Sequence, residues 1–205
     1  DMIYLDSPNN PTGFQFSNKD LEKLIKSFSG PIIIDEAYGE FSNSSVLSLV
    51  KKYPNLILVK TLSKAFGLAG LRIGYMIADK KFTEVFSNVI QYPYPLNTLA
   101  IECGILAIEK SKQIISIFEI IKKQRVRIIK NLKKYDAFDV FDSNANFVLF
   151  DAKGADTRVY NALIEQGISI RKLGKLASHK GCLRVTIGTS DMNSKFLLAI
   201  RDLLE

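Results

Sequence analysis

The sequence predicts an α/β layer with a mostly parallel sheet, followed by a smaller α+β unit. Two observations lead to this prediction. Residues 1–90 alternate short apolar strands with helices, and residues 138–204 mix strands and helices after a long stretch of helical spacing. We place a domain boundary near residue 95, so that 1–95 form part of a large domain and 96–205 form a small C-terminal domain with a linking long helix.

In the first part, apolar runs bounded by turn-forming residues mark the strands. These strands are expected at 2–5, 31–35, 56–60 and 71–78. Ser17, with Asp20 three residues later, resembles a capping box and predicts a helix that runs to about Phe28. Two further helices are expected over 46–53 and 80–91.

In the second part, apolar residues recur at helical spacing from about Asn97 to Lys134, which predicts one long helix or two in succession. The tail then carries alternating strand and helix signals. Strands are expected over 138–141, 146–150, 168–171 and 182–188. Helices are expected over 156–166 and 191–204, and a loop over 172–181. These elements would form a compact α+β unit.

Composition limits the kinds of partner. The 28 lysines and arginines exceed the 21 aspartates and glutamates, which gives a formal net charge of +7. Small anionic ligands fit this charge, but no nucleic-acid-binding signature accompanies it, so we expect no nucleic-acid partner. No apolar run approaches the ~20 residues of a membrane helix, and no targeting segment is visible, so cytoplasm is the default location. Cys103 and Cys182 lack metal-ligand spacing and are expected to be reduced thiols in or near the core, with no metal bound.

Lys64 is the most informative residue. It follows an apolar strand and is flanked by small, hydroxyl and apolar residues, which would partly desolvate its amine and favour a Schiff base. Arg72 lies eight residues further on, and a planar guanidinium binds phosphate through two bonds. Thr61 and Ser63 add hydroxyl donors. An amine beside a phosphate clamp predicts pyridoxal phosphate as the cofactor.

Three further residues lie at strand ends, where α/β sheets build their sites. Asp35 ends an apolar run and could pair with a protonated pyridine nitrogen, although a helix-capping role is about as plausible. Tyr38 could reach the ring oxygen of the cofactor or could belong to the core. Asn10, in an Asn-Pro-Thr-Gly turn, could donate to the same oxygen, but this motif alone favours an ordinary turn asparagine.

Two arginines in the tail are candidates for anion binding. Arg184 interrupts an apolar strand, which is costly without an anionic partner, either a structural carboxylate or a substrate carboxylate. Arg171 ends the strand before it and is either a second anion-binding residue or a surface arginine. His179 is the sole histidine and is interpreted as an exposed loop residue.

Taken together, these motifs resemble those of the class I/II aminotransferases of fold type I. The motifs are Asn10-Pro11-Thr12-Gly13, Asp35-Glu36-Ala37-Tyr38, Ser63-Lys64 with Arg72, and Arg184. Within that family the chain is most similar to the histidinol-phosphate aminotransferases. This closer likeness is carried by the run from Thr61 to Tyr75, by Tyr92-Pro93-Tyr94-Pro95-Leu96-Asn97 and by Asn144-Ala145-Asn146-Phe147-Val148-Leu149-Phe150. The spacing from Arg171 to Arg184, with Gly181-Cys182-Leu183 before the second arginine, also matches. The resemblance implies that 1–95 are the C-terminal part of the large domain of a pyridoxal-phosphate transferase.

The resemblance also implies a role for each residue. Lys64 would bond to the cofactor aldehyde and move the proton, while Asp35 would pair with the pyridine nitrogen. The ring oxygen would be bonded by Asn10 and Tyr38, and the phosphate by Thr61, Ser63 and Arg72. Arg184 would take the carboxylate of glutamate or 2-oxoglutarate, and with Arg171 the phosphate of histidinol phosphate, beside Asn10 in the substrate site.

The implied reaction is transamination between small-molecule amines and 2-oxo acids, in a homodimer. Threonine-phosphate decarboxylation and aromatic transamination on the same scaffold are the alternatives. The chain opens at Asp1 within an apolar strand, and the family carries a further part before this point, so we expect a piece of a longer protein. A piece of this kind would have an exposed sheet edge and could be catalytically incompetent.

Overall fold

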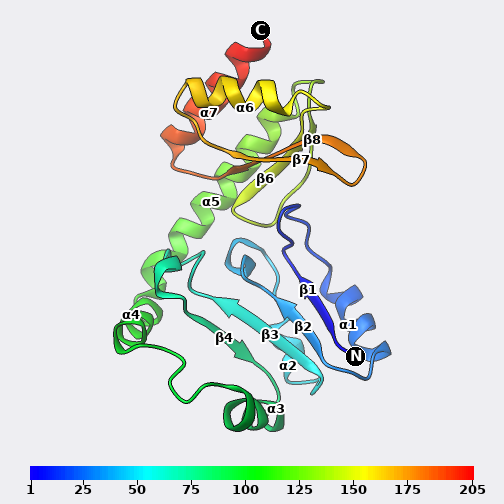
Figure 1. The fold of residues 1–205 in the computed structure, drawn as a ribbon, viewed down its shortest axis with the longest axis vertical. Helices are drawn as coiled ribbons and strands as arrows, with labels where there is room; N and C mark the ends of the chain where they lie inside the picture. Colours follow the sequence, from blue (N-terminus) through cyan, green and yellow to red (C-terminus); the bar gives the residue numbers. More distant parts are fainter. The chain divides into compact units, whose positions relative to one another are not determined.

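The computed structural model describes residues 1–205, which form two compact units (Figure 1). The first unit consists of 1–9 and 15–118, and the second of 10–14 and 119–205. The turn at 10–14 therefore packs with the second unit, although the segments on either side of it belong to the first. The division into domains at residue 95 stays a prediction.

The first unit contains a four-stranded, mostly parallel sheet, as the sequence predicts. Its strands lie in the order β1 (Ile3–Asp6), β2 (Ile32–Asp35), β3 (Leu56–Thr61) and β4 (Gly74–Ile77). The first three run parallel, and β4 is antiparallel to β3. The carboxyl ends of β2 and β3 therefore reach the same edge of the sheet, where open α/β sheets bind ligands.

The capping box predicted for the first helix is confirmed. Helix α1 (Asn18–Ser27) begins after Ser17, whose Oγ accepts from the backbone N–H of Asp20 at 3.1 Å. Leu21 and Ile25, one turn apart, point from this helix into the core between it and the sheet. The other helical segments are η1 (Gly39–Phe41), α2 (Leu47–Val50), η2 (Ala69–Leu71), α3 (Lys80–Val85), η3 (Phe86–Ile90) and α4 (Thr98–Glu109).

The strand expected over 71–78 begins later than predicted. Residues Ala69–Leu71 form a turn of 3₁₀ helix, and Arg72 has left-handed backbone angles, with φ 57. A left-handed residue cannot continue an extended ladder, so pairing with β3 starts only at Gly74. The long helical stretch is two helices in succession, because α4 ends at Glu109 and α5 covers Ser111–Leu132.

The second unit is an antiparallel sheet covered by helices. Its strands are β5 (Asp139–Val140), β6 (Phe147–Asp151), β7 (Arg171–Leu176) and β8 (His179–Thr186), in the order β5-β6-β8-β7. Helices α6 (Asp156–Glu165) and α7 (Ser190–Leu204) complete it (Figure 1). Alternate residues of β6 and β8 enter one core with residues of α5 and α7, among them Val148, Phe150, Leu183, Ile128 and Phe196.

The loop expected over 172–181 is wrong, because these residues form most of the β7–β8 hairpin. Register shifts near Gly174 and a left-handed Ala177 (φ 52) interrupt the ladder, which accounts for the weak alternation in the sequence. His179 lies in β8 and is only partly buried, with a side chain 36% exposed, and its Nδ1 lies 3.1 Å from Asp151 Oδ2. The interpretation of His179 as an exposed loop residue is therefore also wrong.

Asp151 is a buried carboxylate that links β6 to β8. Its Oδ1 accepts from the backbone N–H groups of Lys153 and Gly181, both at 2.8 Å. Burial alone would raise the pKa of Asp151, but these two bonds and the contact with His179 outweigh it and hold that pKa below its usual range.

Replacing Asp151 with asparagine is expected to lower the free energy of unfolding by about 1–2 kcal/mol at neutral pH. A carboxyl whose pKa is depressed by folding stabilises the protein above its unfolded pKa and loses that effect as the pH falls through its folded pKa. The difference between Asp151→Asn and wild type should therefore shrink in acid. Urea unfolding at neutral and acidic pH measures it, and a pH-independent difference would contradict this explanation.

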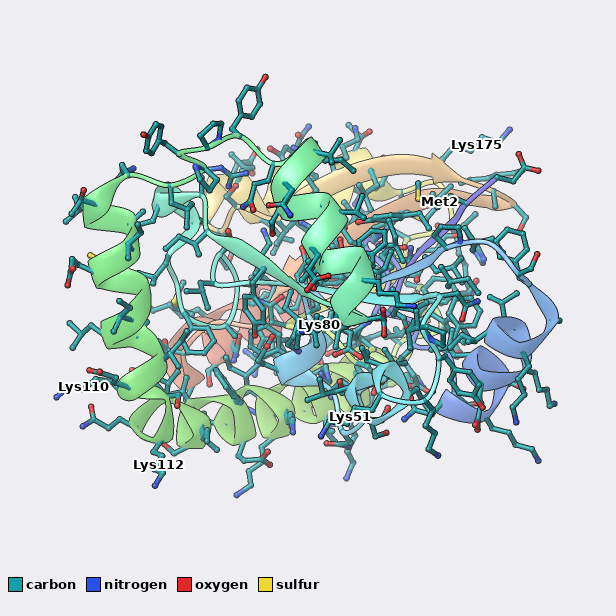
Figure 2. All side chains as sticks on the ribbon, turned by 90° about the horizontal axis from the view of Figure 1, so that it is seen from below. Met2, Lys51, Lys80, Lys110, Lys112 and Lys175 are labelled. Atoms are coloured by element: carbon teal, nitrogen blue, oxygen red, sulfur yellow. The ribbon has the colours of Figure 1, made fainter.

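The outside of the molecule carries many lysines. Figure 2 shows Lys110 and Lys112 extending outward near the junction of α4 and α5, and Lys175 extending from the β7–β8 hairpin. Cys103 and Cys182 are free thiols, partly and fully buried respectively, as expected. None of the helices combines the length and the apolar character that a membrane crossing requires.

Candidate active site

A pocket of about 360 Å³ lies at the carboxyl ends of β2 and β3 in the first unit. The structure brings together here most of the residues that the sequence marks for cofactor binding. Those that line the pocket are Asp35, Thr61, Ser63, Lys64 and Arg72. Asp35 is the last residue of β2 and Thr61 is the last residue of β3, so the two parallel strands bring both residues to the pocket.

The Asp35 carboxylate is held at both oxygens. Its Oδ1 accepts from the backbone N–H of Ala37 at 2.8 Å, and its Oδ2 accepts a short hydrogen bond from the hydroxyl of Tyr4 on β1. Tyr4 is absent from the residues that the sequence marked. The register of β1 on β2 is the signal that would have indicated Tyr4. Tyr4 pairs with Ile33, which lies two residues before Asp35 and on the same face of the sheet.

Lys64 lies in the loop that leaves β3. Its Nζ is 5.7 Å from the ring centroid of Tyr38, which is 9% exposed and lies on the turn after β2. Lys64 itself is exposed, so the expected partial desolvation of its amine is wrong. The apolar neighbours Leu62 and Phe66 pack into a separate small cluster instead of surrounding the lysine.

The hydroxyls and the guanidinium form the other end of the pocket. Thr61 Oγ1 lies 2.9 Å from Ser63 Oγ and donates to the carbonyl of Ile73 at 3.0 Å. Arg72 donates from Nη1 to the carbonyl of Ala69 at 3.2 Å. Its left-handed backbone is costly for a residue with a side chain, by about 1–2 kcal/mol, and such conformations gather at functional sites.

The pocket residues fit pyridoxal phosphate. That molecule presents an aldehyde, a basic ring nitrogen and a phosphate. The pocket offers a lysine amine, a fixed carboxylate, and hydroxyls beside a guanidinium, all on one unit. Each of these side chains has the charge or hydrogen-bonding character that the corresponding group of the cofactor requires.

The second unit carries the other predicted residues, Asn10, Arg171 and Arg184. Nη1 of Arg184 donates to Oδ1 of Asn10 at 2.5 Å, and its guanidinium carbon lies 4.7 Å from the ring centroid of Phe147. Nε of Arg184 is buried without a hydrogen-bond partner. Arg171 is exposed and lies directly opposite Arg184 in the β7–β8 ladder. Two like charges in facing positions repel each other, and an anion between them would relieve that repulsion.

Gly13 explains why the Asn10 turn packs on the second unit. Its φ is 73, and a Cβ at this position would lie 2.2 Å from Ser143 Oγ. The carbonyl of Gly13 accepts from the backbone N–H of Asn144 at 2.8 Å. Only glycine allows this close approach, which positions the turn that carries Asn10.

The fold and the two groups of residues are those of a pyridoxal-phosphate transferase, and comparison with known proteins identifies the family. A family model described as aminotransferase class I and II matches residues 1–200. The chain belongs to this family, which confirms the resemblance found in the sequence.

Individual relatives give a closer description. The histidinol-phosphate aminotransferase of Thermoanaerobacter pseudethanolicus is 36% identical over 203 residues, which cover 99% of this chain and 57% of that protein. A solved structure, the histidinol-phosphate aminotransferase from Clostridium acetobutylicum, has a TM-score of 0.89 at 29% identity and covers 99% of this chain and 64% of its own. The L-threonine-O-3-phosphate decarboxylase from Porphyromonas gingivalis has a TM-score of 0.87 at 26% identity, over 100% of this chain and 64% of its own. The chain therefore spans a little over half the length of the first relative.

Proposed function

We propose that the complete gene product is a pyridoxal-phosphate-dependent aminotransferase that converts histidinol phosphate and 2-oxoglutarate to imidazole acetol phosphate and glutamate. The observation that carries this proposal is the pocket in which Asp35, Lys64 and Arg72 meet. The names of the relatives support the choice of amine donor. As part of the same proposal, the enzyme is a cytoplasmic homodimer that acts on small-molecule amines and 2-oxo acids.

The residues of the pocket divide the work of the reaction. When bound, the cofactor accepts the electron pair that the substrate carbon releases on losing its proton. Nζ of Lys64 would hold the cofactor through its aldehyde, and as a free amine it would take the proton from the substrate carbon. Asp35 would hold a proton on the ring nitrogen through its negative charge. Asn10 and Tyr38 would bond the ring oxygen, and Thr61, Ser63 and Arg72 would hold the phosphate.

The arginines of the second unit recognise the substrates. Arg184 binds the carboxylate of glutamate or 2-oxoglutarate, and its buried, unpartnered Nε is the donor that such an anion would satisfy. Together with Arg171, which lies opposite it in the ladder, the guanidinium of Arg184 binds the phosphate of histidinol phosphate. Asn10 holds Arg184 in position through the bond from Nη1.

A panel of amines tests this assignment. With 2-oxoglutarate as acceptor, we expect histidinol phosphate to give the highest kcat/KM, ahead of aromatic amino acids and histidinol. Arg171→Ala should raise KM for histidinol phosphate about 10-fold, because a charge-assisted bond to phosphate is lost, and should leave KM for unphosphorylated histidinol unchanged.

The second candidate function is decarboxylation of threonine phosphate. The structural likeness to the Porphyromonas gingivalis decarboxylase favours it, since the same cofactor pocket serves both reactions. If the enzyme releases carbon dioxide from threonine phosphate and forms glutamate from none of the amines, its function is decarboxylation and not transamination. Preference for an aromatic amino acid over histidinol phosphate would instead indicate an aromatic aminotransferase.

A further inference from the structure

We propose that Tyr4 is a positioning residue for the cofactor, because its hydroxyl fixes the orientation in which the Asp35 carboxylate meets the ring nitrogen. This inference rests on the proposed function, since it requires that the pocket bind a molecule with a protonated ring nitrogen. Tyr4 does not line the pocket itself; it acts through Asp35.

The strand register places the two side chains together. In the parallel pair β1–β2, Tyr4 is opposite Ile33 and Asp6 is opposite Asp35. Ile32 and Ile34 point into the core and are fully buried, so Ile33 and Asp35 point to the other face of the sheet. Tyr4 shares that face, and its side chain is long enough to reach Asp35, two residues beyond Ile33 along β2. The contact is therefore a consequence of how the sheet is paired.

The two hydrogen bonds to Asp35 fix the plane of its carboxylate. Ala37 donates from a rigid backbone N–H to Oδ1, while Tyr4 donates to Oδ2. Rotation of the carboxylate about its Cβ–Cγ bond would break both bonds. Each carboxylate oxygen can accept more than one hydrogen bond, so this arrangement still leaves an acceptor direction for a ring N–H. A carboxylate that is oriented in advance needs no rearrangement when the cofactor binds.

Tyr4 is suited to this role because it stays a donor. Its pKa is raised to about 12, first by partial burial and then by the hydrogen bond to Asp35 and the charges of Asp35 and Asp6. The hydroxyl therefore keeps its proton at neutral pH. Tyr4 is also 55% exposed, so its ring contributes little to the core, and its hydroxyl donates to Asp35.

The test compares two cofactors on the apo form of the complete gene product. Tyr4→Phe should weaken the binding of pyridoxal phosphate about 3- to 10-fold, because Asp35 loses one of its two fixed bonds. For an analogue in which carbon replaces the ring nitrogen, the same change should alter the dissociation constant less than about 2-fold, since Asp35 has no ring N–H to meet. Absorbance or fluorescence titration measures both constants without any need for turnover.

The control is Tyr53→Phe. Tyr53 also donates to a carboxylate, that of Glu22 at 2.6 Å, but outside the pocket, so this variant should bind both cofactors like wild type. A second check places Tyr4→Phe in an Asp35→Ala background, where it should have no further effect on affinity.

Other outcomes separate the role of Tyr4 from the proposed function. Equal losses for both cofactors, or no loss for either, would show that Tyr4 does not act through the ring nitrogen. Failure of the wild-type protein to bind pyridoxal phosphate at all would remove this inference together with the proposed function. Binding with the expected Tyr4 effect, but with decarboxylation as the reaction, would leave this inference standing and overturn only the transamination.

Discussion

Lys64→Ala is expected to reduce transamination by the complete gene product at least about 10⁴-fold, because no other amine can replace it. Two lysines line the pocket, Lys60 and Lys64. Nζ of Lys60 lies between Glu36 and Glu40, at 3.2 Å and 3.0 Å, and is held there by both charges. Lys64 takes part in no ion pair and lies in the exposed loop after β3, so its amine can both bond to the cofactor and leave it.

Covalent attachment gives a readout that does not depend on rate. Borohydride reduction of the loaded enzyme, followed by peptide mass analysis, should find the cofactor on the peptide that contains Lys64. In Lys64→Ala that mass should be absent. Lys80→Ala is the matched control, because Lys80 is an exposed lysine at the start of α3 (Figure 2) and should leave attachment and activity unchanged. Attachment to Lys60, or a full rate in Lys64→Ala, would overturn the assignment.

The parts of the site that the sequence predicts are those carried by short local patterns. Asp35 ends one apolar strand and Lys64 lies three residues after another, so the strand assignment alone places both at one edge of the sheet. The capping box at Ser17 is local in the same sense. In each case the residue and the neighbour that positions it lie within a few residues of one another.

The features that the sequence does not reveal depend on contacts between distant segments. The hairpin over 172–181 is stabilised by hydrogen bonds between its strands, while its lysines and glycines carry no apolar alternation. The bond between Tyr4 and Asp35 requires the register of two strands that are separated by a helix. The exposure of Lys64 depends on where Leu62 and Phe66 pack, which their apolar character alone does not determine.

A buried ion-pair network lies directly behind the candidate site. Glu36, between Asp35 and Tyr38 in the sequence, is 1% exposed. Its carboxylate accepts from Ser45 Oγ and from the backbone N–H of Val46, both at 2.7 Å, in addition to its pairing with Lys60. The network therefore joins the turn after β2 to the end of β3, and those two segments carry most of the pocket.

Replacing Glu36 with alanine is expected to lower the free energy of unfolding by about 2–4 kcal/mol. The change removes three hydrogen bonds and leaves the N–H of Val46 buried without its acceptor. Lys60 keeps Glu40 as a partner, which limits the loss to less than that of an isolated buried charge. Urea unfolding of the complete gene product measures the effect. Glu84→Ala is the control, because Glu84 pairs with Lys80 on the surface at 3.7 Å and should leave the midpoint unchanged.

The pH dependence separates the ion pair from the loss of side-chain volume. Burial alone would lower the pKa of Lys60, but the charges of Glu40 and Glu36 outweigh it and raise that pKa above its ordinary value. A lysine whose pKa is raised by folding stabilises the protein below its unfolded pKa and loses that effect as the pH rises through its folded pKa. The difference between wild type and Glu36→Ala should therefore persist through neutral pH and narrow only in strong alkali. A difference that stays constant into strong alkali would mean that packing, and not the charge on Lys60, makes Glu36 important.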